Sequence, residues 1–275
     1  LLNVGLDLYF VAVLKAGVAG AALATALSQT AAAAACVIYG FVSVPYFREA
    51  FRSLRPEKDM VRRTVLVSLP AGGQNAFTYI SGSLLQSIVN GFGVTAIGAF
   101  TATSQMESLI RHVYLGLGAA SAAFTGQNMG AGLERRVREG AGAAVRISAA
   151  VSFVLAVTFL AGAGPIMSVF VEDPAMVELA ARGMRILSLF FVWMGTAQVF
   201  HHFLNGAGDT VYPLVNGAVE AAARILFAAA LALWIPGGGV GGIWTATGLA
   251  WLVSAVSVYL RYRQGRWRGK SLVRK

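Results

Sequence analysis

The chain has 275 residues, of which 57% are hydrophobic and 12% are charged, and its formal net charge at pH 7 is +10. Soluble globular domains contain about 45–50% apolar and about 25% charged residues, so this composition excludes a water-soluble protein of this size. The positive charge lies in short segments between apolar runs, which argues against a nucleic-acid-binding surface.

Seven apolar stretches follow a shorter apolar run over 1–14. They are expected as helices near 18–45, 65–92, 95–124, 141–170, 176–205, 211–235 and 239–262. A helix needs about 20 apolar residues to cross a lipid bilayer, and each stretch is long enough. The sequence therefore predicts an all-α polytopic membrane protein embedded in a lipid bilayer.

Basic residues gather in three of the segments between these stretches: 48–63, 135–138 and 261–275. Positively charged loops remain in the cytoplasm, so we expect the C-terminal tail to be cytoplasmic. Segment 46–64 is expected to form a basic amphipathic connector on the inner leaflet. A solvated linker is the alternative.

Two segments of the chain match each other. Residues 17–27 and 239–249 are identical at six of eleven positions, at a constant offset of 222. Repeats are typical of secondary transporters, whereas chance similarity between Gly- and Ala-rich helices is the alternative. The repeat predicts the end of a first six-helix lobe at 1–45, a connector at 46–64, a complete second lobe at 65–262 and a basic tail at 263–275. Most of the first lobe is expected to lie outside this sequence.

Five motifs in chain order resemble the multidrug and toxic compound extrusion (MATE) family. They are NVGLDLYF at 3–10, GVAGAALATALSQ at 17–29, LPAG at 69–72, GQNMGAG at 126–132 and NGAGDT at 205–210. The resemblance covers the whole chain. It implies a twelve-helix protein that exports amphipathic, often cationic drugs or toxins by alternating access, driven by inward proton or sodium flow.

The resemblance also implies the partners and the location of the protein. The expected partners are small-molecule drugs or toxins, a coupling cation and the first lobe, with no cofactor beyond the ion. The expected location is the bacterial inner membrane. A lipid-linked oligosaccharide flippase of the same superfamily is the alternative, but it would need a more cationic cavity.

Two positions depart from the family pattern. Branches of the family carry carboxylates at positions that correspond here to Thr78 and Gly195. The resemblance therefore gives no basis for a cation site of that kind in this lobe. Catalytic motifs such as HExxH or Gly-x-Ser-x-Gly do not occur in the sequence, and we expect no enzymatic activity.

Charged pairs lie near the middle of two predicted helices. Glu107 and Arg111 are four residues apart, as are Glu220 and Arg224, and this spacing places each pair on one helical face. Charges at this depth usually face the protein interior or an aqueous cavity. Each pair is therefore either a helix-packing ion pair or part of a pathway in which a substrate or proton replaces the arginine.

Polar residues in two other predicted helices complete the candidate pathway. Asn75, Tyr79, Gln86 and Asn90 share one face of the helix near 65–92. Gln198 and His202 lie in the second half of the stretch near 176–205. These side chains either line a cavity or form hydrogen bonds between helices. A histidine could relay protons or lie at the membrane interface.

Overall fold

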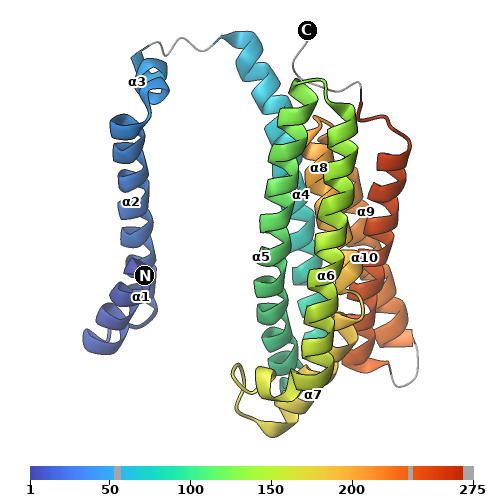
Figure 1. The fold of residues 1–275 in the computed structure, drawn as a ribbon. Coiled ribbons are helices and arrows are strands. Elements are labelled where there is room, and N and C mark those ends of the chain that lie inside the picture. Colours follow the sequence, from blue (N-terminus) through green and yellow to red (C-terminus); the bar gives the residue numbers. More distant parts are fainter. Residues whose placement is uncertain (53–56, 235–237, 269–275) are drawn as a thin grey trace. The chain divides into compact units, whose positions relative to one another are not determined.

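The computed structural model describes residues 1–52, 57–234 and 238–268, and every element in this part is helical (Figure 1). Side chains at positions 50–52, 60, 63, 67, 71, 75, 233 and 234 are not among those described. The chain forms two compact units, Leu1–Val61 and Arg62–Lys275. The boundary lies inside the predicted connector 46–64, of which residues 53–56 are outside the described part, as are residues 269–275 of the predicted tail.

The first unit contains an interrupted helix, a long helix and a short one. α1 (Leu2–Asp7) continues into a π-helical segment, η1 (Leu8–Val13). α2 (Gly17–Ser43) follows, and after the extended residue Val44 comes α3 (Pro45–Arg52). Only three residues of α2 are buried, so an apolar helix of 27 residues presents its side chains to its surroundings. Lipid or another apolar protein surface must cover a helix of this kind.

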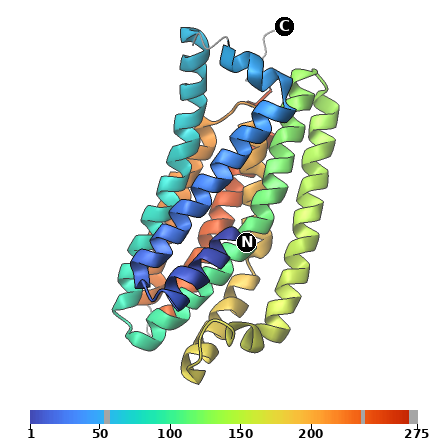
Figure 2. The ribbon, with the colours of Figure 1, turned by 90° about the vertical axis from the view of Figure 1, so that its left-hand side faces the viewer.

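The second unit is a bundle of long helices. Its elements are α4 (Lys58–Asn90), which begins at the end of the first unit, α5 (Val94–Gly130), α6 (Glu134–Met167), α7 (Pro174–Ser188), α8 (Phe191–Gly206), α9 (Val211–Ala228), η2 (Ala229–Trp234) and α10 (Gly239–Arg263). Figure 2 shows the length of α4, α5 and α6 from the side. The predicted helices are present, although α5 and α6 begin or end several residues beyond the predicted bounds.

One predicted helix is divided. The stretch near 176–205 forms α7 and α8, with a break at Leu189 and Phe190. The Phe190 N–H bonds to the Leu187 carbonyl at 2.9 Å, which is the tighter three-residue spacing of a turn. The Phe190 ring lies against Gly248 of α10 so closely that a Cβ at position 248 would overlap it. No Gly or Pro in the local sequence indicates this break. A tertiary contact accompanies it.

Small residues bring the helices of the second unit close together, as in many membrane bundles. A Cβ at Gly206 of α8 would lie 2.8 Å from the Cα of Ala122 in α5. At Gly183 of α7 a Cβ would overlap the ring of Trp244. The buried Trp244 indole donates to Thr103 Oγ1 at 3.0 Å and so links α10 to α5.

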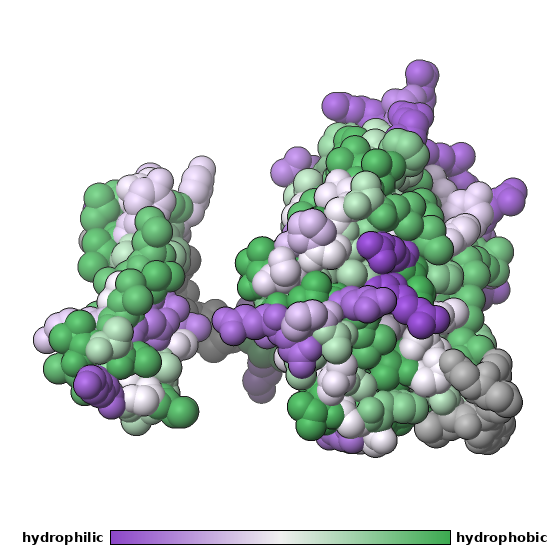
Figure 3. All heavy atoms as spheres, turned by 90° about the horizontal axis from the view of Figure 1, so that it is seen from below, coloured by the Kyte–Doolittle hydropathy of each residue, from purple (hydrophilic) through white to green (hydrophobic). Residues whose placement is uncertain are grey.

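Four helical segments of the described part are long and apolar enough to cross a membrane: α2, α6, α9 with the first part of η2, and α10. α7 and α8 are too short individually, and α4 and α5 carry more polar residues. Large hydrophobic side chains, among them Phe153, Val154 and Leu226, are exposed on the outside of the bundle, where lipid can cover them. Figure 3 looks along the helices onto their ends, where hydrophobic residues lie beside hydrophilic ones.

The two matched segments have the same local geometry. Gly17 begins α2 with φ +56°, and Gly239 begins α10 with φ +45°, a backbone conformation that favours glycine. A π-helical segment, η1 or η2, precedes each helix. Three residues further on, Gly20 and Gly242 lie against the backbone of that segment, where a side chain would not fit without displacement. Equivalent helix starts at the same offset support a true internal repeat.

Candidate functional site

A cavity of about 760 Å³ lies inside the second unit between α4, α5, α8, α9 and α10, with one residue of α7, Leu187, in its lining. Small-molecule sites are typically 300–1,000 Å³. Its polar lining comprises Gln74, Thr78, Tyr79, Gln86, Thr103, Ser104, Glu107, Ser108, Arg111, His112, Gln198, His201, His202, Asn205, Glu220, Arg224 and Thr247. Leu85, Phe100, Leu115, Leu187 and Trp244 supply apolar surface.

Both predicted ion pairs form and both line this cavity. Arg111 bonds to Glu107 Oε1 through Nη2 on α5, and Arg224 bonds to Glu220 Oε1 at 2.8 Å on α9. All four side chains are at most one-fifth exposed. The four-residue spacing explains each pair locally, because residues i and i+4 are neighbours on a helix.

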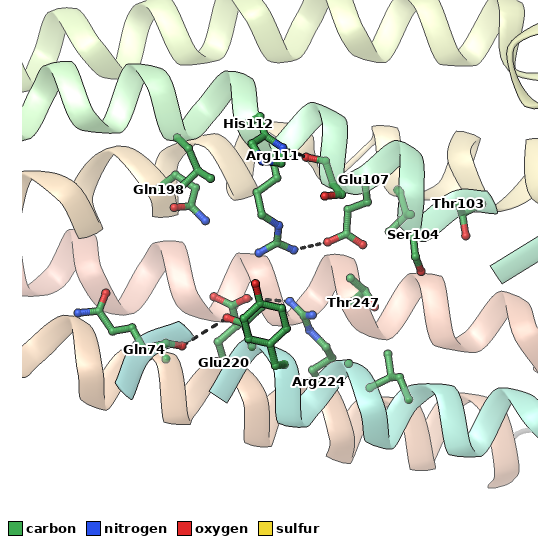
Figure 4. A pocket seen from close by; sticks show the side chains of 18 of the residues that line it. Gln74, Thr103, Ser104, Glu107, Arg111, His112, Gln198, Glu220, Arg224 and Thr247 are labelled. Carbon is green, nitrogen blue, oxygen red and sulfur yellow. Dashed lines mark hydrogen bonds and ion pairs between the residues drawn. The ribbon is translucent and has the colours of Figure 1, made fainter. Parts of the chain in front are cut away.

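The two pairs face each other from opposite walls. Figure 4 shows Arg111 across from Glu220, and Glu107 across from Arg224. Arg111 interacts electrostatically with Glu220 as well as with Glu107. The charges therefore alternate around a rectangle, which we call the charge quartet. Its two carboxylates and two guanidinium groups cancel, and the described residues of the cavity lining include no other Asp, Glu, Lys or Arg.

The polar face of α4 is divided in the structure. Tyr79 and Gln86 line the cavity, together with Gln74 and Thr78, which the sequence did not single out as pathway residues. Asn90 is not part of the lining and accepts a hydrogen bond from Gln86 Nε2 at 3.0 Å. The side chain of Asn75 lies outside the described residues.

Both candidates from the stretch near 176–205, Gln198 and His202, lie on α8 and line the cavity. The neighbouring His201 also lines it and pairs with Asn216 of α9, whose amide nitrogen lies 2.6 Å from His201 Nε2. The same nitrogen donates to Ser254 Oγ of α10 at 2.7 Å. This buried network joins three helices beside the cavity. Sequence spacing could not reveal it, because its partners are distant along the chain.

Thr78 and Gly195, the two positions that depart from the family pattern, have different surroundings. Thr78 lines the cavity, and its hydroxyl lies 3.4 Å from the Gln74 carbonyl. Gly195 is buried in α8, where a Cβ would overlap Ser148 Oγ and the ring of Tyr114. A carboxylate at position 195 would require these neighbours to move.

The arrangement provides charges, amides, hydroxyl groups and aromatic rings that can bind a small organic molecule. Among the residues that the structure describes, no group of three or more His, Cys, Asp or Glu side chains is placed to hold a metal ion. The most evident feature is a polar, charge-balanced chamber inside a helical bundle whose outer surface is largely apolar.

Comparisons with known proteins agree with this architecture. A family model described as MatE matches residues 70–230. This chain is 29% identical to "Probable multidrug resistance protein YpnP" of Bacillus subtilis over 276 residues, which cover 98% of this chain. It is 24% identical to "Multidrug export protein MepA" of Staphylococcus aureus over 267 residues, which cover 94% of this chain. The crystal structure of a MATE protein in complex with MaL6 superimposes over 98% of this chain, with a TM-score of 0.88 at 20% identity. The chain spans 60%, 57% and 61% of these three proteins, respectively.

Proposed function

The chain belongs to the MatE family, whose members are membrane transporters and not enzymes, and from this premise we propose that the protein is a secondary active exporter. Its substrates are amphipathic drugs or toxins, many of them cationic, and it moves them by alternating access. Inward flow of protons or sodium ions drives export. The tail is cytoplasmic, and the protein acts in a bacterial inner membrane.

The cavity is the observation that carries this proposal. Its volume of about 760 Å³ matches a drug-sized molecule. Polar and ionisable residues inside a membrane bundle are costly and usually mark a substrate or ion pathway. Here they come from five helices of one bundle and converge on one chamber.

A first lobe is proposed as the partner of this cavity. The chain spans about 60% of the length of its relatives, and alternating access needs two bodies that move around a binding site. The nearly unburied α2 of the first unit and the repeat geometry at Gly17 and Gly239 support a two-lobe protein.

The balance of charges favours a drug exporter over the flippase alternative. A flippase that binds an anionic pyrophosphate needs unpaired cationic groups in its cavity. In this cavity both guanidinium groups, of Arg111 and Arg224, are paired with carboxylates. Positions 78 and 195 hold Thr and Gly, which offer no carboxylate to a coupling ion. Among the described residues that line the cavity, the acidic groups are Glu107 and Glu220.

The test uses the full-length protein in proteoliposomes loaded with ethidium, a fluorescent cationic drug. We expect transport when an inward proton or sodium gradient is imposed and none after that gradient is collapsed. Comparing a protonophore with sodium removal identifies the ion. Transport that is unaffected by either treatment would exclude secondary antiport, and the absence of any drug transport would exclude the exporter.

A further inference from the structure

An arginine on the outer face of α6 lies where the protein meets lipid. Figure 2 shows α6 at the edge of the second unit. Its buried residues, among them Ala144, Ser148 and Ser152, recur every four residues and so form one face of the helix. Arg146 lies two residues from both Ala144 and Ser148, which is about half a helical turn, and it is exposed. Its side chain therefore points away from the bundle.

The sequence that follows Arg146 determines the depth of this residue in the membrane. The next 21 residues, 147–167, contain no Asp, Glu, Lys or Arg. At about 1.5 Å per residue they span about 31 Å, which matches the hydrocarbon core of about 30 Å. On the same face as Arg146 this stretch exposes Phe153, Val157 and Leu160. Arg146 therefore lies at the boundary between the hydrocarbon core and the lipid headgroups.

The guanidinium group of Arg146 is available to an anion from outside the protein. Arg146 makes no ion pair among the described residues, whereas Arg135 of the same helix is paired with Glu139. Helical side chains lean toward the N-terminus of their helix, which here is the basic end, so Arg146 extends toward Gly142 one turn away. A Cβ at position 142 would meet nothing within 4 Å. The surface beside the guanidinium group is therefore open.

The end of the bundle nearest Arg146 is basic. The described segments 134–139 and 261–268 contain seven arginines and two glutamates. Arg268 Nε lies 3.7 Å from Glu134 Oε2, which shows that the two segments lie together. Their surplus of positive charge attracts anions and repels the ammonium group of a zwitterionic headgroup. A phospholipid with a net negative charge is thus favoured over one without.

We propose that Arg146 and the open surface beside Gly142 bind the phosphate of an anionic phospholipid, whose acyl chains lie along Phe153, Val157 and Leu160. Arginine suits this ligand because its guanidinium group donates two parallel hydrogen bonds to phosphate oxygens. The inference depends on the position of α6 in a membrane and is independent of the proposed export function.

The test measures lipid binding to the purified full-length protein by native mass spectrometry, which resolves the protein with successive bound lipids. Phosphatidylglycerol is compared with phosphatidylcholine, which has the same phosphate and, in matched preparations, the same acyl chains. We expect the first phosphatidylglycerol to bind about fivefold more tightly than the first phosphatidylcholine, which is the effect of about one arginine on an anionic lipid at a membrane surface.

Three variants assign this preference to a place on α6. Arg146→Gln should abolish it, and the variant should fold because position 146 is exposed. Gly142→Leu keeps the charge but fills the open surface, so it should reduce the preference. The matched control Arg136→Gln removes the same charge from an exposed position on the same helix, ten residues nearer its basic end, and should keep the full preference.

Equal binding of the two lipids by the wild-type protein would overturn the lipid site. So would a preference that either Arg146→Gln or Gly142→Leu retains in full, or one that Arg136→Gln also loses. A mass of two protein chains that Arg146→Gln dissociates would place a second copy of the protein on this face instead of a lipid. Drug export is tested separately by the ethidium assay, so either proposal can fail while the other stands.

Discussion

Replacement of Asp209 by Asn should destabilise the second unit by about 2–4 kcal/mol, because it leaves Arg261 largely buried without a counter-charge. Asp209 follows α8 and is fully buried, and its Oδ2 accepts a bond from Arg261 Nε of α10 at 2.8 Å. The guanidinium group of Arg261 also lies 4.9 Å from the centroid of the Tyr212 ring. This pair therefore joins α10 to the loop between α8 and α9.

The magnitude follows from these contacts. Removing one partner of a buried ion pair typically costs about 3–5 kcal/mol. Asparagine can still accept a hydrogen bond, and the Tyr212 ring continues to stabilise the cation by about 1 kcal/mol, so we expect a loss about 1 kcal/mol smaller, of about 2–4 kcal/mol. The double variant Asp209→Asn/Arg261→Gln removes both charges and should be more stable than the single variant.

A second pair in the same bundle provides the control. Arg135 Nε and Glu139 Oε1 also lie 2.8 Å apart, but their side chains are 91% and 60% exposed, against 11% and 0% for Arg261 and Asp209. Exposed pairs contribute little to stability, so Glu139→Gln should match the wild type. The assay is unfolding of the full-length protein in an SDS titration followed by tryptophan fluorescence. Equal effects of Asp209→Asn and Glu139→Gln, or a double variant as unstable as the single one, would refute the reasoning.

Three further predictions concern the pathway, the packing and the topology. Glu107→Gln should leave expression near normal, because Arg111 still interacts electrostatically with Glu220, but it should abolish efflux of singly cationic drugs because the cavity charge rises to plus one. Unchanged efflux of cations per folded molecule would make the pair purely structural. Gly206→Ala should destabilise the bundle by about 1–3 kcal/mol through overpacking against the backbone of α5, whereas Gly116→Ala, where a Cβ meets nothing within 4 Å, should be neutral or stabilising in the same SDS titration. Cysteines replacing Leu133 and Ala175, which flank α6 and the turn after it, should react with an impermeant maleimide from the cytoplasmic and the outer side respectively, and labelling from the same side would contradict the topology.

The sequence predicted the features of this protein that depend on residues close together in the chain. Long apolar runs predicted the helices, because each helix satisfies its own backbone hydrogen bonds in lipid. Spacing by four residues predicted the pairs Glu107/Arg111 and Glu220/Arg224, because that distance is one helical turn. The family motifs added the all-α MATE fold, which the structural comparison confirms.

Only the tertiary structure decided which of these local features meet. The two ion pairs belong to α5 and α9, and their opposition across one cavity depends on how the helices between them pack. Asp209 bonds to Arg261, which lies 52 residues away on α10, so no local sequence pattern indicates this pair. Gln74 and Thr78 line the cavity while Asn90 does not. Helical periodicity defines a face of α4, and neighbouring helices determine which part of that face meets the cavity.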